Sequence, residues 1–296
     1  MKVGIIINGI SRRKNFAKEI VPALRQHFEV EAWETRSENH AIELAQKANA
    51  DILISAGGDG TLNQVLNGVM RNEKQPVIGI LPLGTANDFA HACGLRANAQ
   101  ELIDLIKNNS VHPTDAGKID LNDENGNKIT RYFLNTCSVG MGPDVADAVR
   151  KDSRRWGTKI TYFKAVLKVF FTEKPKTILI TDGEWKWDAP LRLAAIANTK
   201  TMAGDFHIAP DNKIDDGIFS VYIAGALSVF QFVQELLKLV KGKKSASPLV
   251  RCHQASRCHL QGDALIEADG ELQGRLPASV EVLAGRINVL RPKTTA

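Results

Sequence analysis

Apolar runs alternate with amphipathic stretches over the first 110 or so residues. The apolar runs are short enough for buried strands, and the stretches between them repeat apolar residues at helical spacing. The predicted strands are Val3–Asn8, Val30–Thr35, Ile52–Ile54 and Val77–Leu81, and the predicted helices are Asn15–His27, Ser37–Ala48 and Ala99–Asn108. Such alternation predicts βαβ units, hence a Rossmann-like α/β domain with a parallel sheet over residues 1–117.

From about Lys118 onward the pattern changes to short strands separated by Gly and Asp turns. The predicted strands are Ile119–Asn122, Tyr132–Val139, Thr177–Asp182, Leu191–Asn198, Phe219–Ala224, Arg257–Ile266 and Glu281–Leu290. Two helical segments, Asp144–Phe171 and Ser228–Val240, interrupt them. This pattern predicts an antiparallel β-sandwich over residues 118–290, with a cleft between the two domains.

The strand at Ile52–Ile54 runs into Gly57, Gly58, Asp59 and Gly60. Thr61 and Gln64 follow as a T-x-x-Q pattern, which predicts a helix start at that point. Backbone N–H groups at a helix start bind anions, and glycine lets a phosphate approach the backbone. A carboxylate beside phosphate favours phosphoryl transfer over simple binding. The alternative is a tight turn in which Asp59 is a local cap.

A second strand-turn-helix pattern follows, in which Val77–Leu81 leads into Leu83-Gly84-Thr85-Ala86-Asn87-Asp88. In a parallel sheet both turns lie at the carboxyl edge, where open α/β folds bind ligands. Thr85, Asn87 and Asp88 would then offer a hydroxyl, an amide and a carboxylate to one crevice. The alternative is that Asn87 and Asp88 only cap the next helix.

Two acidic turns in the second half are Asp215-Asp216-Gly217 and Asp269-Gly270-Glu271. Each reads equally well as a hairpin turn. An interdomain cleft would bring them to the N-terminal motifs, where carboxylates can bind magnesium or accept a proton from an attacking hydroxyl.

The composition of the chain excludes only a few classes of function. The chain has 296 residues and a formal net charge of +5, which fits an anionic membrane surface, a nucleotide or nucleic acid without choosing among them. No apolar run reaches the roughly 18 residues that span a bilayer. The four cysteines form no CxxC pair, and reduced thiols in a cytoplasmic protein are expected. P-loop and protein-kinase signatures are absent from the sequence.

Basic residues alternate with aromatic and aliphatic ones between Arg150 and Phe171. One interpretation is a surface helix that touches anionic lipid. The other is a helix packed on the second domain whose lysines extend into solvent.

The pair Gly57-Gly58-Asp59-Gly60-Thr61 and Leu83-Gly84-Thr85-Ala86-Asn87-Asp88-Phe89-Ala90 resembles the diacylglycerol kinase catalytic domain family, in particular its bacterial soluble lipid kinases. Sphingosine and ceramide kinases share the first motif, and NAD kinases share a shorter version. The resemblance implies ATP at the glycine turn, Mg2+, and a return of residues 291–296 to the first domain. The nucleotide-binding residues it implies are Asn8, Thr35, Gly57, Gly58, Asp59, Gly60, Thr61, Asn63, Gly84, Thr85 and Asn87. It further implies Glu271 as base, Asp59 and Asp88 near the transferred phosphate, and a structural magnesium on Asp216 with the carbonyls of Lys213 and Ile218.

One departure concerns Asn8, which the family often follows with proline but which here precedes Gly9. The role of Asn8 is therefore less firmly implied, while Arg12, Arg13 and Lys14 remain available to phosphate or a head group.

The resulting hypothesis is an ATP-dependent lipid kinase that phosphorylates a hydroxyl of a diacylglycerol-like or phosphatidylglycerol-like lipid and so belongs to phospholipid metabolism. The alternatives are a kinase of a soluble substrate, similar to NAD kinase, and a non-catalytic module that senses nucleotide or lipid. We expect a cytoplasmic protein, monomer or homodimer, with peripheral contact to the inner face of an anionic membrane and no nucleic-acid partner.

Overall fold

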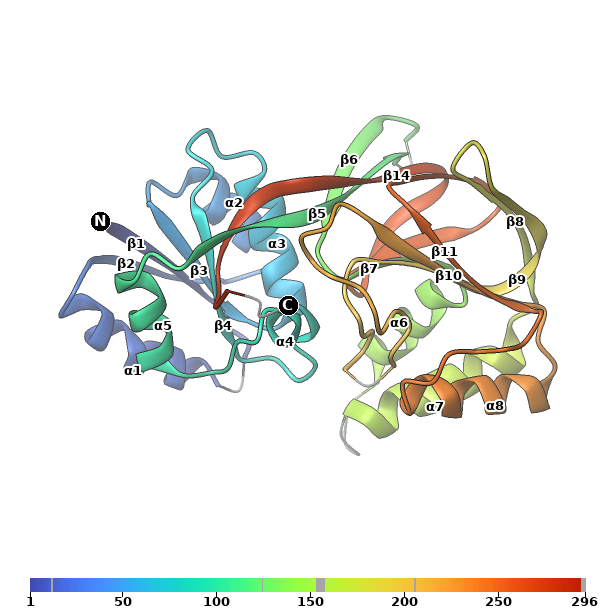
Figure 1. The fold of residues 1–296 in the computed structure, drawn as a ribbon. Coiled ribbons are helices and arrows are strands. Elements are labelled where there is room, and N and C mark those ends of the chain that lie inside the picture. The colour runs from blue at the N-terminus through green and yellow to red at the C-terminus, as the bar shows by residue number, and fades with distance from the viewer. Residues whose placement is uncertain (12, 124, 153–157, 205, 294–296) are drawn as a thin grey trace. The chain divides into compact units, whose positions relative to one another are not determined.

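The computed structural model describes residues 1–11, 13–123, 125–152, 158–204 and 206–293 (Figure 1). The chain forms two compact units. Unit 1 comprises Met1–Asp115 and Gly285–Ala296, and unit 2 comprises Ala116–Ala284. The sequence boundaries at 117/118 and 290/291 differ from these because two long strands, β5 (Val111–Asn122) and β14 (Glu271–Leu290), each belong partly to both units.

Unit 1 is an α/β domain in which four parallel strands are ordered β4-β3-β1-β2. The end of β14 joins β4 in parallel, with Val289 paired to Ile78. The strands are β1 (Lys2–Ile7), β2 (Glu29–Glu34), β3 (Ile52–Gly57) and β4 (Val77–Pro82). The helices are α1 (Lys14–Arg25), α2 (His40–Lys47), α3 (Asp59–Val69), α4 (Asp88–Ala92) and α5 (Ala99–Lys107).

Helices cover both faces of this sheet, with α1 packed beside α5 and α2 beside α3 (Figure 1). Every residue of β3 is buried. This burial explains why the central strands read as continuous apolar runs and not as alternating ones.

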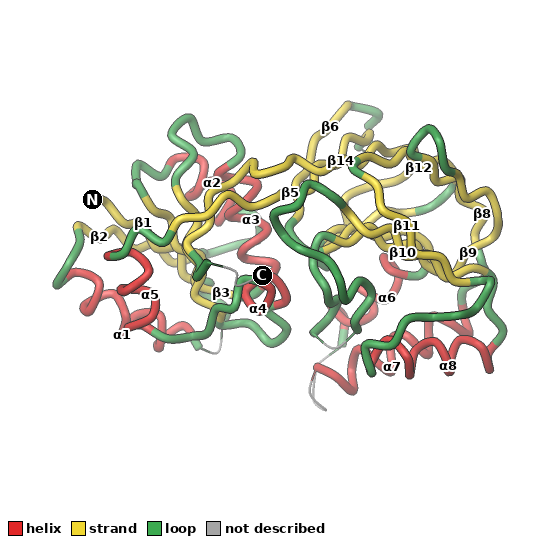
Figure 2. The backbone as a smooth tube through the Cα atoms, viewed as in Figure 1, coloured by secondary structure: helices red, strands yellow, loops and turns green. Residues whose placement is uncertain are grey.

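Unit 2 is mostly antiparallel, and Figure 2 shows its strands in yellow. Its pairings close a barrel-like circuit in the order β9-β8-β12-β14-β13-β7 and back to β9. The strands are β6 (Lys128–Phe133), β7 (Thr136–Gly140), β8 (Lys176–Thr181), β9 (Lys186–Ala197), β10 (Phe219–Gly225), β11 (Val250–Ala255), β12 (Arg257–Gly262) and β13 (Leu265–Ala268), together with parts of β5 and β14. The core of the circuit includes the stacked rings of Phe133 and Phe219.

Three helices pack against the β9-β10 side of unit 2 and form a second apolar cluster there. They are α6 (Gly142–Lys151), α7 (Thr158–Thr172) and α8 (Val229–Val240). Ser228 caps α8 through a reciprocal capping box with Gln231.

Several element boundaries differ from the sequence predictions. Helix α3 begins at Asp59 behind the N-cap Gly58, so the helix start predicted from Thr61 and Gln64 is wrong. Helix α2 begins at His40 behind Asn39, not behind Ser37. The predicted helix 144–171 is two helices, and the predicted strand 132–139 is two strands. Strand β11 was not predicted.

Candidate functional site

The carboxyl ends of the four parallel strands in unit 1 lie at one edge of the sheet. Ile7 is paired with Ala56 and with Glu34, and Gly57 with Pro82. The four loops that follow therefore start side by side. They carry the predicted nucleotide-binding residues Asn8, Thr35, Gly58 to Thr61, and Gly84 to Asn87.

The two glycine turns are in direct contact. A Cβ on Gly84 would lie 2.4 Å from the Cα of Gly58, and a Cβ on Gly58 would lie 3.0 Å from the Cα of Gly84. Only glycine at both positions permits this approach. The Asn87 side chain closes the second turn, because its Oδ1 accepts from Gly84 N at 3.0 Å and its Nδ2 donates to the Gly84 carbonyl at 2.9 Å.

Asp59 and Asp88 lie at the starts of neighbouring helices, α3 and α4. The Asp59 Oδ1 accepts from Phe89 N at 3.4 Å, so its carboxylate connects the two turns. Asp88 is buried. Asn87 has a left-handed backbone and no cap bond from its side chain, so the predicted alternative of an ordinary side-chain cap does not hold for Asn87.

Two further contacts join the remaining loops to this edge. Asn8 Nδ2 donates to Thr61 Oγ1 at 2.9 Å, and Gly9 N donates to Thr35 Oγ1 at 3.0 Å. Asn63 is different, since its Oδ1 accepts from Asn67 Nδ2 one turn further along α3. Thr85 is exposed. The structure thus brings Asn8, Thr35 and Thr61 to the glycine turns, but it commits Asn63 to an interaction within the helix.

This edge has the properties of an anion-binding site. A helix start supplies N–H groups and a positive dipole end, and the glycines leave room for a ligand near the backbone. A narrow depression lies between Ser55, Gly58, Asp59 and Asn87.

A second functional edge lies in unit 2. Ser220 is paired with Ala197, and Ala197 with Thr136. The Asp269 N–H donates to the Thr136 carbonyl at 2.9 Å. The Asp216 loop, which precedes β10, and the Asp269-Gly270-Glu271 turn therefore lie at the same edge of the sheet. Three strand-to-strand steps separate them, roughly 14 Å at about 4.8 Å per step.

The turn that carries Glu271 is a two-residue hairpin. Asp269 and Gly270 have φ values of 50° and 85°, both left-handed, as an Asp-Gly hairpin turn requires. The Asp269 carboxylate accepts from the N–H groups of Leu134, Asn135 and Thr136 at 2.8 to 3.2 Å. The predicted alternative of a hairpin turn is thus correct for the backbone. The hydrogen bonds of Asp269 hold this turn in place and so position the residue that follows it, Glu271.

Glu267 supports the same turn from inside the fold. It is buried, its Oε2 accepts from Gly270 N at 3.0 Å, and its Oε1 accepts from the Ser138 hydroxyl. The pKa of Glu267 is raised to about 7, mainly by burial and to a smaller extent by the nearby Asp269 and Glu271 carboxylates, while the hydrogen bonds from Ser138 and Gly270 lower it. Neither Asp269 nor Glu267 was predicted as a positioning residue. The only local signal for Glu267 was a glutamate inside the apolar run Leu265-Ile266-Glu267-Ala268.

The predicted magnesium loop is compact and exposed. Asp216 Oδ1 accepts from Ile218 N at 3.2 Å, and Gly217 between them has a φ of 72°. Ile214 and Phe219 on either side are buried, which anchors the loop. A carboxylate and backbone carbonyls are oxygen donors of the kind magnesium prefers, so Asp216, Lys213 and Ile218 fit the ion by donor type. Within the described residues, no group of three or more His, Cys, Asp or Glu side chains could hold a metal.

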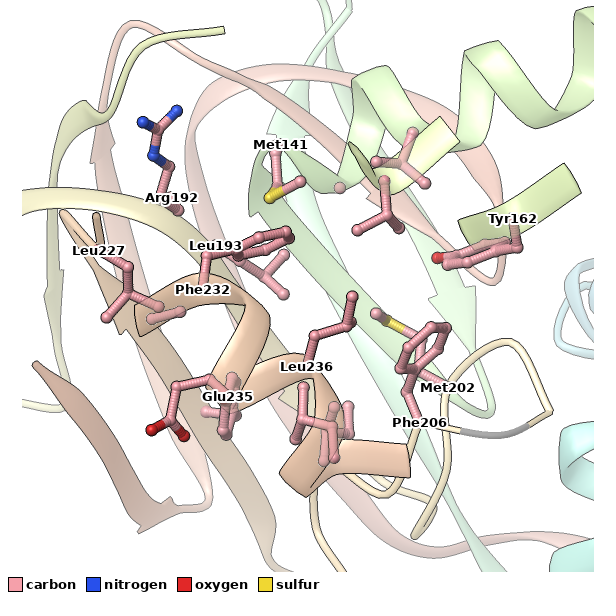
Figure 3. A pocket seen from close by; sticks show the side chains of 17 residues that line it. Met141, Tyr162, Arg192, Leu193, Met202, Phe206, Leu227, Phe232, Glu235 and Leu236 are labelled. Atoms are coloured by element: carbon pink, nitrogen blue, oxygen red, sulfur yellow. The ribbon is translucent and has the colours of Figure 1, made fainter. Parts of the chain in front are cut away.

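An apolar cavity of about 60 Å³, partly open to solvent, lies between α6, α7, α8 and the β9-β10 sheet (Figure 3). Met141, Tyr162, Phe206, Phe232 and Leu236 are among its lining residues. The guanidinium of Arg192 and the carboxylate of Glu235 are turned away from its apolar centre (Figure 3).

One loop of the chain leads from the edge that carries Glu271 to the cavity lining. Asn198 begins a loop at that edge, where its N–H donates to the Asn135 carbonyl at 2.8 Å. The same loop then supplies Met202, Phe206 and Ile208 to the cavity lining.

Some basic residues singled out in the sequence lie outside the described residues. They are Arg12, Arg154 and Arg155. No helix in the part of the chain that the structure describes has both the length and the apolar character needed to cross a bilayer.

Comparisons with known proteins agree with both units. Residues 2–119 match the family model described as diacylglycerol kinase catalytic domain, and residues 136–291 match the YegS C-terminal NAD kinase beta sandwich-like domain. A diacylglycerol kinase of Bacillus subtilis is 27% identical over 99% of this chain and 97% of its own. One of Staphylococcus haemolyticus is 28% identical over 98% of this chain and 88% of its own.

Solved structures share the fold. The crystal structure of a putative diacylglycerol kinase from Bacillus anthracis has a TM-score of 0.78 at 24% identity, and covers 98% of this chain and 96% of its own. Yeast NADH kinase complexed with NADH has a TM-score of 0.55 at 16% identity, and covers 99% of this chain and 84% of its own.

Proposed function

This chain belongs to the diacylglycerol kinase catalytic domain family of lipid kinases, and from that premise we propose that it transfers the γ-phosphate of ATP to a hydroxyl of a diacylglycerol-like or phosphatidylglycerol-like lipid. Family membership implies the use of ATP. Beyond family membership and the use of ATP, we propose the identity of the lipid acceptor, of the catalytic base and of the metal ion.

The apolar cavity in unit 2 is the observation that carries the choice of acceptor. Its lining is almost wholly apolar, and the two charged groups beside it point away. Burying acyl methylenes there is favourable by about 0.8 kcal/mol for each CH₂. A soluble acceptor such as a dinucleotide would leave its polar groups unpaired in the same space. The cavity therefore supports a lipid over a soluble substrate.

In the proposed reaction, the Glu271 carboxylate accepts the proton of the lipid hydroxyl while the hydroxyl oxygen bonds to the γ-phosphorus and ADP leaves. The turn of Asp269 and Gly270 positions this carboxylate, and a positioned base typically contributes about 10² to 10⁴-fold. The glycine turns of unit 1 hold the phosphates, with Asp59 and Asp88 beside them. Most of the remaining acceleration in phosphoryl transfer comes from positioning and charge neutralisation.

Magnesium has two proposed roles. Bound with ATP, it neutralises phosphate charge. At Asp216 and the carbonyls of Lys213 and Ile218, it would hold the loop before β10, and its separation from Glu271 supports a structural role there.

The test is transfer of labelled γ-phosphate from ATP in the presence of magnesium. A total lipid extract in mixed micelles is the acceptor, with NAD and free sugars assayed in parallel. We expect a labelled lipid whose chromatographic mobility identifies the acceptor, and a loss of at least about 100-fold in Glu271→Ala.

The control is ATP affinity, which Glu271→Ala should keep. Label in a water-soluble product would replace the lipid kinase proposal with a kinase of soluble substrates. Unchanged turnover in Glu271→Ala would remove Glu271 as the base.

A further inference from the structure

Helix α8 has one broad apolar face, and its polar residues Gln231, Gln234, Glu235 and Lys238 share the other side. Its inner residues Phe232, Leu236 and Leu239 line the cavity. The part of the apolar face beside them, the α8 outer face, consists of exposed residues: Val229, Phe230, Val233, Leu237 and Val240. Phe230 is 73% exposed and Leu237 is 53% exposed. An amphipathic helix normally buries its apolar stripe, and here the stripe is wider than the part that packs on the protein, so the exposed part has the character of a contact surface.

Helix α7 extends this exposed apolar surface. The rings of Phe170 on α7 and Phe232 on α8 stack with centroids 4.0 Å apart, and the helices lie side by side (Figure 1). Ile160, Phe163 and Phe171 on α7 are also exposed. Of the twelve large apolar side chains found exposed in the described part of the chain, these two helices supply eight.

The charge around this surface is positive. Lysines gather at the end of α8 and on α7: Lys238, Lys241, Lys243, Lys244, Lys164 and Lys168. The segments 158–172 and 229–248 contain a single carboxylate, Glu235, which is buried and pairs with Lys238 at 2.7 Å. Lys244 pairs with Asp211, a carboxylate outside these segments, at 2.5 Å. The remaining lysines leave the surface with a positive excess.

The positive charge helps to decide whether a second copy of the chain or a lipid bilayer covers this surface. In a symmetric dimer the same surface meets itself, so the lysines of one copy would need carboxylates on the same surface of the other. The two helices present no exposed carboxylate. A bilayer with anionic lipids supplies both an apolar interior for the exposed side chains and negative head groups for the lysines.

We infer that the α8 outer face, together with the lysines at its C-terminal end, docks the protein on an anionic lipid bilayer. The inference rests on the proposed function for its biological sense, because the inner face of the same helix borders the proposed acyl cavity. Docking would thus bring the cavity to the membrane that contains the acceptor. The docking itself can be measured without turnover.

The experiment is sedimentation of the full chain with vesicles of phosphatidylcholine alone, or of phosphatidylcholine and phosphatidylglycerol in equal amounts. We expect binding only to the second kind. Lys241→Gln with Lys243→Gln should weaken binding roughly 25-fold, at about fivefold per lysine. Phe230→Ala with Leu237→Ala should weaken it at least about tenfold.

A matched control is Lys128→Gln with Lys186→Gln, two exposed lysines elsewhere in unit 2, which should bind like the parent. Thermal unfolding checks that all variants fold. Equal binding by parent and α8 variants would overturn the inference. So would a parent chain that ignores both vesicles and forms a dimer that the Phe230 and Leu237 changes dissociate.

Turnover separates this inference from the proposed function. With a short-chain diacylglycerol in detergent micelles, the α8 variants should keep the parent's rate, while with vesicle-embedded lipid they should lose rate in proportion to binding. If the parent binds vesicles as expected but labels no lipid, the proposed function fails and the docking surface stands.

Discussion

Glu267 is a buried carboxyl group of unit 2 whose ionisation should affect stability. Burial raises its pKa to about 7 from an unfolded value near 4.5, so above pH 4.5 the folded chain binds more protons than the unfolded one. The free energy of unfolding should therefore fall as the pH rises from about 4.5 to 7 and level off above. A pKa raised by that amount corresponds to about 3 kcal/mol.

Glu267→Gln should remove this slope. A glutamine can accept from Gly270 N with its oxygen and donate to Ser138 with its amide, so the turn is kept without a buried charge. Urea unfolding at pH 5 and pH 8 measures the effect, with the variant at least as stable as the parent at pH 8. An identical pH slope in both proteins would show that Glu267 does not titrate in this range.

At the scale of elements, the contact between the two glycine turns makes a sharper prediction. Gly84→Ala places a Cβ against the Cα of Gly58, which is backbone and cannot turn aside. We expect the turns to separate, with ATP affinity at least about tenfold weaker and stability lower by about 1 to 3 kcal/mol. Titration calorimetry and thermal unfolding give the two quantities.

Gly183→Ala is the matched control for this pair of turns. Gly183 has a φ of 106°, and a Cβ added there would meet nothing within 4 Å, so alanine adds backbone strain without a collision. It should lose stability but keep ATP affinity. A loss of affinity in both variants would mean that destabilisation alone accounts for the effect of Gly84→Ala.

Local sequence patterns predicted most strands and helices of the nucleotide edge. The features that they did not predict depend on contacts between residues far apart in the sequence. Strand, glycine turn and helix follow one another within a dozen residues, so the nucleotide edge is legible in the sequence. The start of α3 was misplaced because the T-x-x-Q pattern also occurs inside a helix, where Thr61 instead contacts Asn8. The bonds of Asp269 to Leu134 and Asn135 join residues 135 and 134 positions apart, and no local pattern contains them.

At the scale of the whole molecule, the proposed ligand sites are divided between the two units. The glycine turns lie in unit 1, whereas Asp216, Glu271 and the apolar cavity lie in unit 2. A ligand stabilises the state that binds it by about 2.7 kcal/mol at a hundred times its dissociation constant. Magnesium at the Asp216 loop should therefore stabilise unit 2 in the absence of nucleotide.

Asp216→Ala tests this division in the full chain. Without nucleotide, millimolar magnesium should raise the unfolding temperature of the parent but not of the variant, because the remaining carbonyls lack the negative charge that the ion requires. The affinity for ATP, bound at the other unit, should stay within about twofold, since sites without shared contacts behave independently. Calorimetric scans with and without magnesium measure the unfolding temperatures, and a titration with ATP measures the affinity. An equal magnesium effect in both proteins would place the ion elsewhere, and a matching loss of ATP affinity would mean that the Asp216 loop serves the nucleotide directly.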